Sequence, residues 1–262
     1  NNKNNMNNFV VYEQPVAENI RSFLKCEYLH EKINSSLSLE SIWSIKSSIS
    51  ALLEMSDFSQ RINLKVELLK ELEKIGFTLQ KLNEDNEIEL SKFDAYKTEV
   101  DRCLANLNDI NDNPSKTIID NDFLMLVKSK LHIPAGDNFF DMPSYLNFLT
   151  SKKNHIIENI NIWSSPFSCF FDSSKLVLDF KRRSSKFNKY KSNKSYFEKK
   201  LDKNIRIDLV RIRIEKDMNI YPDISVNRQN INAVFKTAYG ENRVAKTIVD
   251  DIEFELSLSI LT

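Results

Sequence analysis

Glycine is scarce in this sequence: its 262 residues contain only three, with six prolines, three cysteines and three histidines. Three scattered glycines cannot build a Walker phosphate loop or a G-x-G-x-x-G dinucleotide loop, and the H-E-x-x-H and G-x-S-x-G motifs are missing too. We therefore expect no catalytic residues and no enzymatic activity, although a nucleophile and a base far apart in the sequence would leave no such motif.

Cysteine is equally sparse and never occurs in a C-x-x-C pair. Cys26, Cys103 and Cys169 are far apart and odd in number, which is typical neither of a disulfide framework nor of a zinc site. We expect three free thiols, no metal site and no cofactor.

Long apolar runs are also absent. No stretch of about 18 uncharged apolar residues occurs, and residues 1–8 read NNKNNMNN, not a basic and then apolar leader. The sequence therefore predicts no membrane span and no signal peptide, and we expect a cytoplasmic protein whose residues 1–8 form a disordered tail. The chain has 37 basic and 37 acidic residues, so it is not a polyelectrolyte as a whole.

Over the first two thirds of the chain, the apolar residues have the spacing of amphipathic helices. They recur every three or four positions, as in the series Leu64, Leu68, Leu72, Ile75, Leu79 and Leu82. This spacing predicts a helical domain over residues 15–180. The leucine series could be the seam of an antiparallel bundle or an interface with a partner.

The last third alternates apolar and charged residues, which predicts a β domain over residues 181–262. The alternation shifts by one step between residues 205–209 and 210–214, which predicts a β-bulge. A short β-type run at residues 9–14 has no local partner, and because an unpaired strand is costly we expect it to join the C-terminal sheet. The predicted fold class is α+β: a mostly helical N-terminal domain and a C-terminal antiparallel β domain that the N-terminal strand completes.

One punctuated segment, LHIPAGDNFFDMPSYLNFL, runs from residue 131 to residue 149. Ile133-Pro134-Ala135-Gly136 predicts a turn, because proline cannot continue a helix and glycine tolerates positive φ. Asp141 is then expected to cap a new helix that has Pro143 in its first turn. We interpret the segment as a rigid corner between two helices.

Charge is balanced overall but not locally. Residues 181–213 contain thirteen Lys and Arg against three Asp and Glu, whereas residues 84–122 contain eleven Asp and Glu against four Lys and Arg. Four aromatic residues interleave with the basic ones: Phe187, Tyr190, Tyr196 and Phe197. A nucleic-acid-binding surface is therefore one hypothesis for residues 181–213. An insertion that contacts acidic faces of a partner, or the chain's own acidic segment, is another.

Five motifs, in this order, resemble the ZapD family of bacterial cell division proteins. They are VYEQPVAENIRSFLKCEYL at residues 11–29, ELLKELE at 67–73, the pattern L-x-I-P-x-G-x-x-x-F-D-x-P at 131–143, IYPDIS at 220–225 and DIEFEL at 251–256. The third motif is the most specific of them. The resemblance extends from about residue 10 to residue 258.

The resemblance implies a function as well as a fold. Proteins of this family have a helical domain joined to a β domain and form symmetric dimers. They bind the conserved C-terminal tail of the tubulin-like GTPase FtsZ and bundle its protofilaments at the division ring. We therefore expect a homodimeric, non-enzymatic FtsZ crosslinker in the cytoplasm at midcell, with no cofactor, no membrane association and no nucleic-acid partner.

The resemblance also implies which residues hold the tail. Arg21 matches a basic family position, Lys25 stands where the family can have arginine, and Arg211 lies on a matching strand. Arg228 falls on a family lysine.

Three positions depart from the family pattern. Asn230 and Val234 stand where the family has two arginines of the tail site, and Phe123 stands where it has a basic residue. Lys236 and Arg243 could supply the missing charge from the same hairpin. The expected tail-binding residues are Arg21, Lys25, Arg211, Arg228, Asn230 and Lys236.

Overall fold

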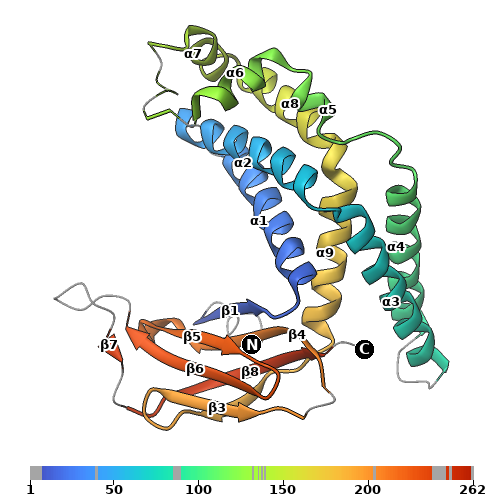
Figure 1. Ribbon diagram of the computed structural model, residues 1–262, viewed down its shortest axis with the longest axis vertical. Helices are drawn as coiled ribbons and strands as arrows, with labels where there is room; N and C mark the ends of the chain where they lie inside the picture. The colour runs from blue at the N-terminus through green and yellow to red at the C-terminus, as the bar shows by residue number, and fades with distance from the viewer. Residues whose placement is uncertain are drawn as a thin grey trace. The chain divides into compact units, whose positions relative to one another are not determined.

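The computed structural model describes residues 8–38, 41–84, 90–131, 133–134, 136, 138, 140–202, 205–237, 246–247 and 250–260. The fold is α+β, as predicted (Figure 1). The chain divides into two compact units, here called the helical unit (Ser22–Leu178) and the sheet unit (Asn1–Arg21 with Asp179–Thr262). Residues 1–7 of the predicted disordered tail lie outside the described residues.

Helices account for the first two thirds of the chain. They are α1 (Glu18–Ser38), α2 (Ile42–Arg61), α3 (Leu64–Glu84), α4 (Leu90–Asn108), α5 (Lys116–Ile119), α6 (Asp122–Leu131), α7 (Pro143–Leu149), α8 (Lys153–Ser164) and α9 (Ser168–Arg183), with a 3₁₀ turn at Ser165–Phe167 before α9. Within the described part of the chain, no helix is both long and apolar enough to cross a bilayer.

The leucine series of α3 is the seam of a helical hairpin. Leu64, Leu68, Leu72, Ile75 and Leu79 are all buried. They pack within the helical unit, where α3 lies beside α4 (Figure 1). Of the two interpretations that the sequence allowed, the bundle seam is therefore the correct one.

The predicted turn after α6 is present at Ile133 and Gly136, while four residues of the segment, at 132, 135, 137 and 139, lie outside the described residues. The glycine is needed for a different reason than the one predicted. Gly136 donates its N–H to the carbonyl of Ile133 at 2.8 Å and is buried. No glycine among the described residues has a positive φ. A Cβ at Gly136 would instead lie 2.5 Å from the carbonyl oxygen of Lys130, so glycine is required there because space is lacking.

The predicted cap of α7 is wrong. The residue before the helix is Met142, whose side chain makes no capping hydrogen bond, and Pro143 occupies the first helical position. Asp141 lies one residue too early. Its own N–H donates to Oδ1 of Asn138 at 2.8 Å, and its carboxylate accepts from the amide of the same residue at 2.8 Å.

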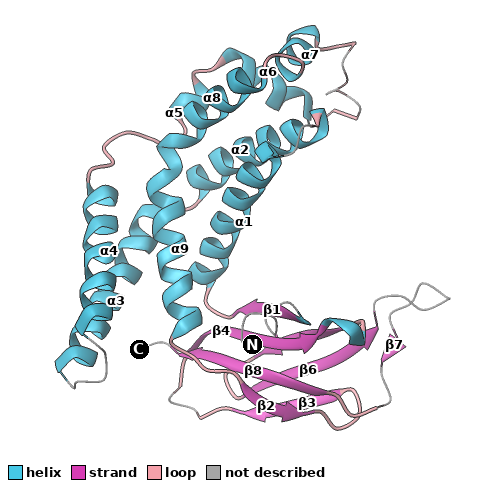
Figure 2. Cartoon of the chain, turned by 180° about the vertical axis from the view of Figure 1, so that it is seen from behind, coloured by secondary structure: helices cyan, strands magenta, loops and turns pink. Residues whose placement is uncertain are grey.

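The sheet unit contains two antiparallel sheets, seen from behind in Figure 2. Its strands are β1 (Phe9–Pro15), β2 (Asn188–Lys191), β3 (Tyr196–Lys200), β4 (Ile207–Glu215), β5 (Ile220–Val226), β6 (Asn230–Thr237), β7 (Lys246–Thr247) and β8 (Glu253–Ile260). The first sheet has the order β1-β4-β8-β2, and the second has the order β3-β6-β5, with β7 also pairing with β6. Inward side chains of both sheets form one apolar core.

The N-terminal strand completes the first sheet, as predicted. β1 pairs with β4 from Phe9 opposite Glu215 to Pro15 opposite Leu209. The predicted irregularity in β4 is also present, because its register with β8 shifts between residues 207 and 209. Beyond this point the side chains at 210, 212 and 214 enter the core.

Candidate functional site

Two of the predicted tail-binding residues lie on α1. The Arg21 side chain is exposed, with Nε 3.6 Å from Oε2 of Glu18. In the helical unit, Nζ of Lys25 lies 3.1 Å from Oε1 of Glu54 and 5.1 Å from the ring centroid of Phe58. Both charges are partly neutralised by a neighbouring carboxylate, and both remain open to solvent.

Arg211 is placed very differently, because only 13% of its side chain is exposed. Nε lies 3.2 Å from Oε1 of Glu13, an ion pair without hydrogen-bond geometry, and Nη1 donates to the carbonyl of Arg182 at 2.9 Å. The Arg182 side chain donates twice to the same Glu13 carboxylate, at 2.9 and 2.7 Å. Burial lowers the pKa of Arg211 despite that carboxylate. Arg211 thus belongs to an internal ion network of the sheet unit.

Asn230 and Lys236 share the outward face of β6, because residues 231, 233 and 235 point into the core. Nδ2 of Asn230 donates to Oε1 of Glu198 at 2.7 Å. Nζ of Lys236 donates to Oδ2 of Asp223 at 2.7 Å, and this hydrogen bond raises the pKa of the lysine. Both polar groups are therefore already engaged by acceptors of the neighbouring strands.

Arg228 lies in the exposed turn between β5 and β6, beside an open cavity of about 770 Å³. We call this cavity the Arg206–Arg228 groove. Its lining residues are Val16, Ala17, Leu201, Ile205, Arg206, Ile207, Asp208, Val226, Asn227 and Arg228. All of them belong to the sheet unit.

Backbone hydrogen bonds hold the walls of the groove together. The N–H groups of Val16 and Ala17 donate to the carbonyl of Asp208, at 2.8 and 3.2 Å. The N–H of Leu201 donates to the carbonyl of Gln229 at 2.6 Å. Three segments that are distant in the sequence are therefore fixed around one hollow.

Apolar side chains and unpaired positive charges meet in this groove. Val16 and Ile205 are each 40% exposed, and Leu201 lies half-buried beside them. Arg206 and Arg228 are exposed, and neither forms an ion pair or a hydrogen bond with another described residue. Such a surface suits an extended peptide that carries apolar side chains and a carboxylate.

Comparison with known protein families decides which family this is. The family model of ZapD, described as a cell division protein, matches residues 24–233. The chain belongs to the ZapD family. The match includes most of the helical unit and, in the sheet unit, the strands from β2 to β5 with the first half of β6. It contains four of the expected tail-binding residues and also Arg206.

Sequence reasoning did not single out Arg206 in this ZapD-family chain. The residue lies in the basic stretch 181–213, and a composition count cannot tell which of those charges are neutralised. In the structure many of them are: Lys181 pairs with Asp208, Arg182 with Glu13, Lys191 with Asp251 and Arg213 with Glu255. Arg206 is exposed without a carboxylate partner among the described residues, and what distinguishes it from other such cations of the stretch is that it lines the same cavity as Arg228.

The aromatic residues of the basic stretch are largely engaged as well. Phe187 lies against the guanidinium groups of Arg211 and Arg213, at 4.8 and 4.5 Å from the ring centroid. Tyr190 and Phe197 contact each other edge to face at the apolar core. These contacts do not favour the nucleic-acid hypothesis, because stacked bases need exposed rings beside free cations.

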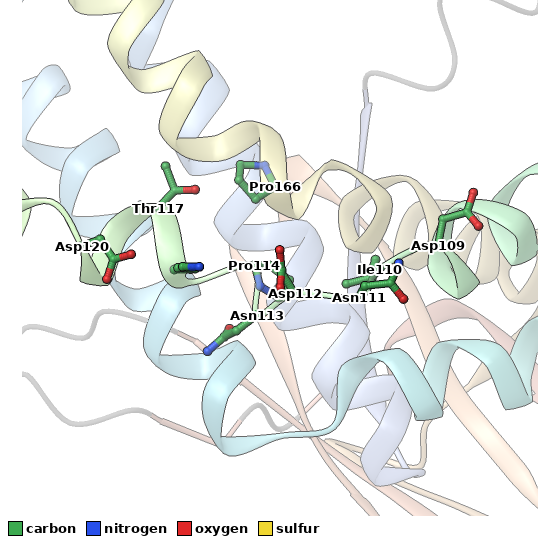
Figure 3. Close-up of a pocket in the computed structure, with 10 residues that line it drawn as sticks. Asp109, Ile110, Asn111, Asp112, Asn113, Pro114, Thr117, Asp120 and Pro166 are labelled. Carbon is green, nitrogen blue, oxygen red and sulfur yellow. The ribbon is translucent and has the colours of Figure 1, made fainter.

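An acidic cavity of about 580 Å³ lies in the helical unit, between α4 and α6 (Figure 3). Asp109, Asn111 and Asn113 have the spacing of the first three ligands of an EF-hand loop, but Pro114 occupies the position where that loop needs glycine. Oδ1 of Asn113 already accepts the N–H of Ser115 at 3.0 Å. Among the described residues, no three His, Cys, Asp or Glu side chains are grouped to hold a metal ion.

The three cysteines are free, as predicted. Cys26 and Cys103 are buried, and Cys169 is half-buried. Burial raises the pKa of the Cys26 thiol to about 12 and raises the pKa of the other two as well. Because the thiolate is the reactive form, these residues are poor nucleophiles at neutral pH.

Proposed function

We propose that this chain is a non-enzymatic cell division factor that binds the C-terminal tail of FtsZ and bundles FtsZ protofilaments at midcell. The observation that carries the proposal is membership of the ZapD family over residues 24–233. The residues of the sheet unit support it, since exposed basic and apolar side chains occur side by side around Arg228. The proposed mechanism needs no catalytic group and no cofactor.

Crosslinking requires two tail sites in one particle, and a homodimer would supply them. A symmetric dimer presents the same site twice. Polymerised FtsZ offers many tails, so the second contact forms at a high effective concentration once the first has formed. Two weak contacts can therefore bridge two filaments.

Low-speed co-sedimentation tests this function. The chain should bring GTP-assembled FtsZ filaments into the pellet, and the effect should disappear with FtsZ that lacks its C-terminal tail. Light scattering after size exclusion should give twice the mass of the 30.6 kDa chain. Bundling of tail-deleted FtsZ to the same extent would refute tail recognition, and a monomer that still bundles would refute the dimer mechanism.

A further inference from the structure

We infer that the Arg206–Arg228 groove holds the end of the FtsZ tail, with its terminal carboxylate between the two guanidinium groups. This inference rests on the proposed function and names the surface of the sheet unit that would bind the tail. It adds Arg206 to the residues that the family resemblance implied, and it gives the leading role to a pair of charges contributed by two separate loops.

The unpaired state of the two arginines is the first argument. Several other arginines of the chain lie beside carboxylates: Arg21 beside Glu18, Arg102 beside Glu99 and Asp172, Arg182 beside Glu13, and Arg213 beside Glu255. Arg206 and Arg228 line one cavity, and no described residue forms an ion pair with either. The one carboxylate among the lining residues, Asp208, is buried and paired with Lys181. The groove therefore carries net positive charge.

The apolar lining is the second argument. Val16 and Ile205 each expose two fifths of their surface in a place where the backbone is fixed by hydrogen bonds. Covering them removes apolar surface from water, which favours binding. An occupant with apolar side chains next to an anionic group satisfies both features of the groove at once.

The size of the groove is the third argument. A volume of about 770 Å³ lies within the range of typical ligand pockets, roughly 300–1,000 Å³. Such a space holds a few residues of extended chain, so it suits the last residues of a tail and not a folded domain. A chain end also supplies a carboxylate whatever its sequence, and guanidinium groups bind carboxylates through two parallel hydrogen bonds.

The test measures binding of a fluorescent peptide with the sequence of the FtsZ C-terminal tail to the full chain by anisotropy. Arg206→Glu and Arg228→Glu should each weaken binding by about tenfold or more, because each removes a charge-assisted contact and adds repulsion. The matched control is Lys186→Glu, which makes the same charge change at an exposed position of the sheet unit outside the groove. It should change the affinity by less than about twofold.

A second arm tests the carboxylate. A peptide with an amidated C-terminus should bind the wild type as weakly as the free peptide binds the arginine variants. In the double variant Arg206→Glu/Arg228→Glu, amidation of the peptide should lower the affinity little further, because the contact with the carboxylate is already lost. Circular dichroism and urea midpoints should match the wild type, and Arg206→Gln and Arg228→Gln repeat the test without repulsion.

The possible results separate the inference from the proposed function. If the wild type binds the tail and the groove variants bind it equally well, the groove assignment is overturned while tail recognition stands. If amidation leaves the affinity unchanged, the position of the carboxylate is overturned. If the wild type neither binds the tail peptide nor bundles FtsZ, the proposed function itself fails.

Discussion

Nζ of Lys181 lies 2.5 Å from Oδ2 of Asp208, and the two side chains are only 5% and 3% exposed. Lys181 stands near the end of α9, and Asp208 stands at the register shift of β4. The backbone carbonyl of the same aspartate holds the N–H groups of Val16 and Ala17. One residue thus ties three segments of the sheet unit and fixes a wall of the Arg206–Arg228 groove.

Asp208→Ala should destabilise the sheet unit strongly. The substitution removes the carboxylate from the buried ion pair with Lys181, and removing one partner of a buried pair typically costs about 3–5 kcal/mol. Urea unfolding followed by far-ultraviolet circular dichroism measures the loss. The double variant Lys181→Met/Asp208→Leu should recover much of it, because both charges of the pair are then replaced by apolar side chains.

Asp223→Ala is the control for this prediction. Asp223 also pairs with a lysine, Lys236, but 60% of its side chain is exposed, and exposed pairs contribute little to stability. Its urea midpoint should stay close to that of the wild type. Equal losses in Asp208→Ala and Asp223→Ala would contradict a special role for the buried pair.

Gly136→Ala should destabilise the helical unit. The new Cβ would lie 2.5 Å from the carbonyl oxygen of Lys130 and 2.8 Å from Cβ of Ile133. The backbone must therefore move, as in overpacked cores, where the cost is about 1–3 kcal/mol. Both tryptophans, Trp43 and Trp163, lie in the helical unit, so the change in the free energy of unfolding can be measured by tryptophan fluorescence in urea.

Gly76→Ala is the matched control within α3. A Cβ at Gly76 would lie 3.8 Å from Cγ1 of Val100, an ordinary contact. Alanine is also the better helix former, by up to about 1 kcal/mol. The variant should be as stable as the wild type or more so. A loss in Gly76→Ala as large as that in Gly136→Ala would show that crowding at Gly136 is not the cause.

The sequence predicted the parts of the fold that follow from periodicity. The leucine spacing of α3 predicted a helix with a bundle seam or a partner interface on one side, and the unpaired run at residues 9–14 predicted a strand that joins the C-terminal sheet. The reason for Gly136 was predicted wrongly, because a glycine needed for φ and a glycine needed for space look alike in a sequence. Only the position of Lys130 distinguishes them.

The candidate site was less predictable, because residues far away in the sequence decide whether a basic side chain is paired with a carboxylate. Arg182 binds Glu13 across 169 positions of the chain, and no local pattern signals that contact. Arg211 was expected at the tail site and lies in the same buried network. Arg206 gave no signal of its own. What sets it apart is that it lines the same cavity as Arg228 and has no ion pair with a described carboxylate.

His30 should make the stability of the helical unit depend on pH. The ring stacks on Phe171 with 4.3 Å between centroids. Burial lowers the pKa of His30 from its usual 6.5, with Lys175 acting in the same direction and nearby carboxylates opposing. The unfolded chain therefore binds a proton more tightly than the folded one. The contribution of the neutral His30 ring to the free energy of unfolding should therefore be fully present above pH 6.5. It should be lost as the pH falls below that value.

The measurement is the urea midpoint, followed by tryptophan fluorescence, between pH 5 and pH 8. His30→Gln should flatten the part of the profile just below pH 6.5, because its side chain does not titrate. His155→Gln is the matched control, because it makes the same substitution at a histidine exposed on α8, and the loss of stability just below pH 6.5 should persist in this variant. An identical slope in His30→Gln and the wild type would contradict the prediction.

Val234→Arg restores an arginine at a position where the family resemblance implies one, and it should not strengthen tail binding. Val234 lies on the outward face of β6, opposite Asp223 on one side and Tyr196 on the other. A new guanidinium group there would compete with Lys236 for the carboxylate of Asp223, outside the Arg206–Arg228 groove. The tail peptide should bind the variant within about twofold of the wild type, since its charge is locally neutralised. A gain of tenfold or more would mean that the outer face of the second sheet also takes part in holding the tail, so that the groove is only one portion of a longer site.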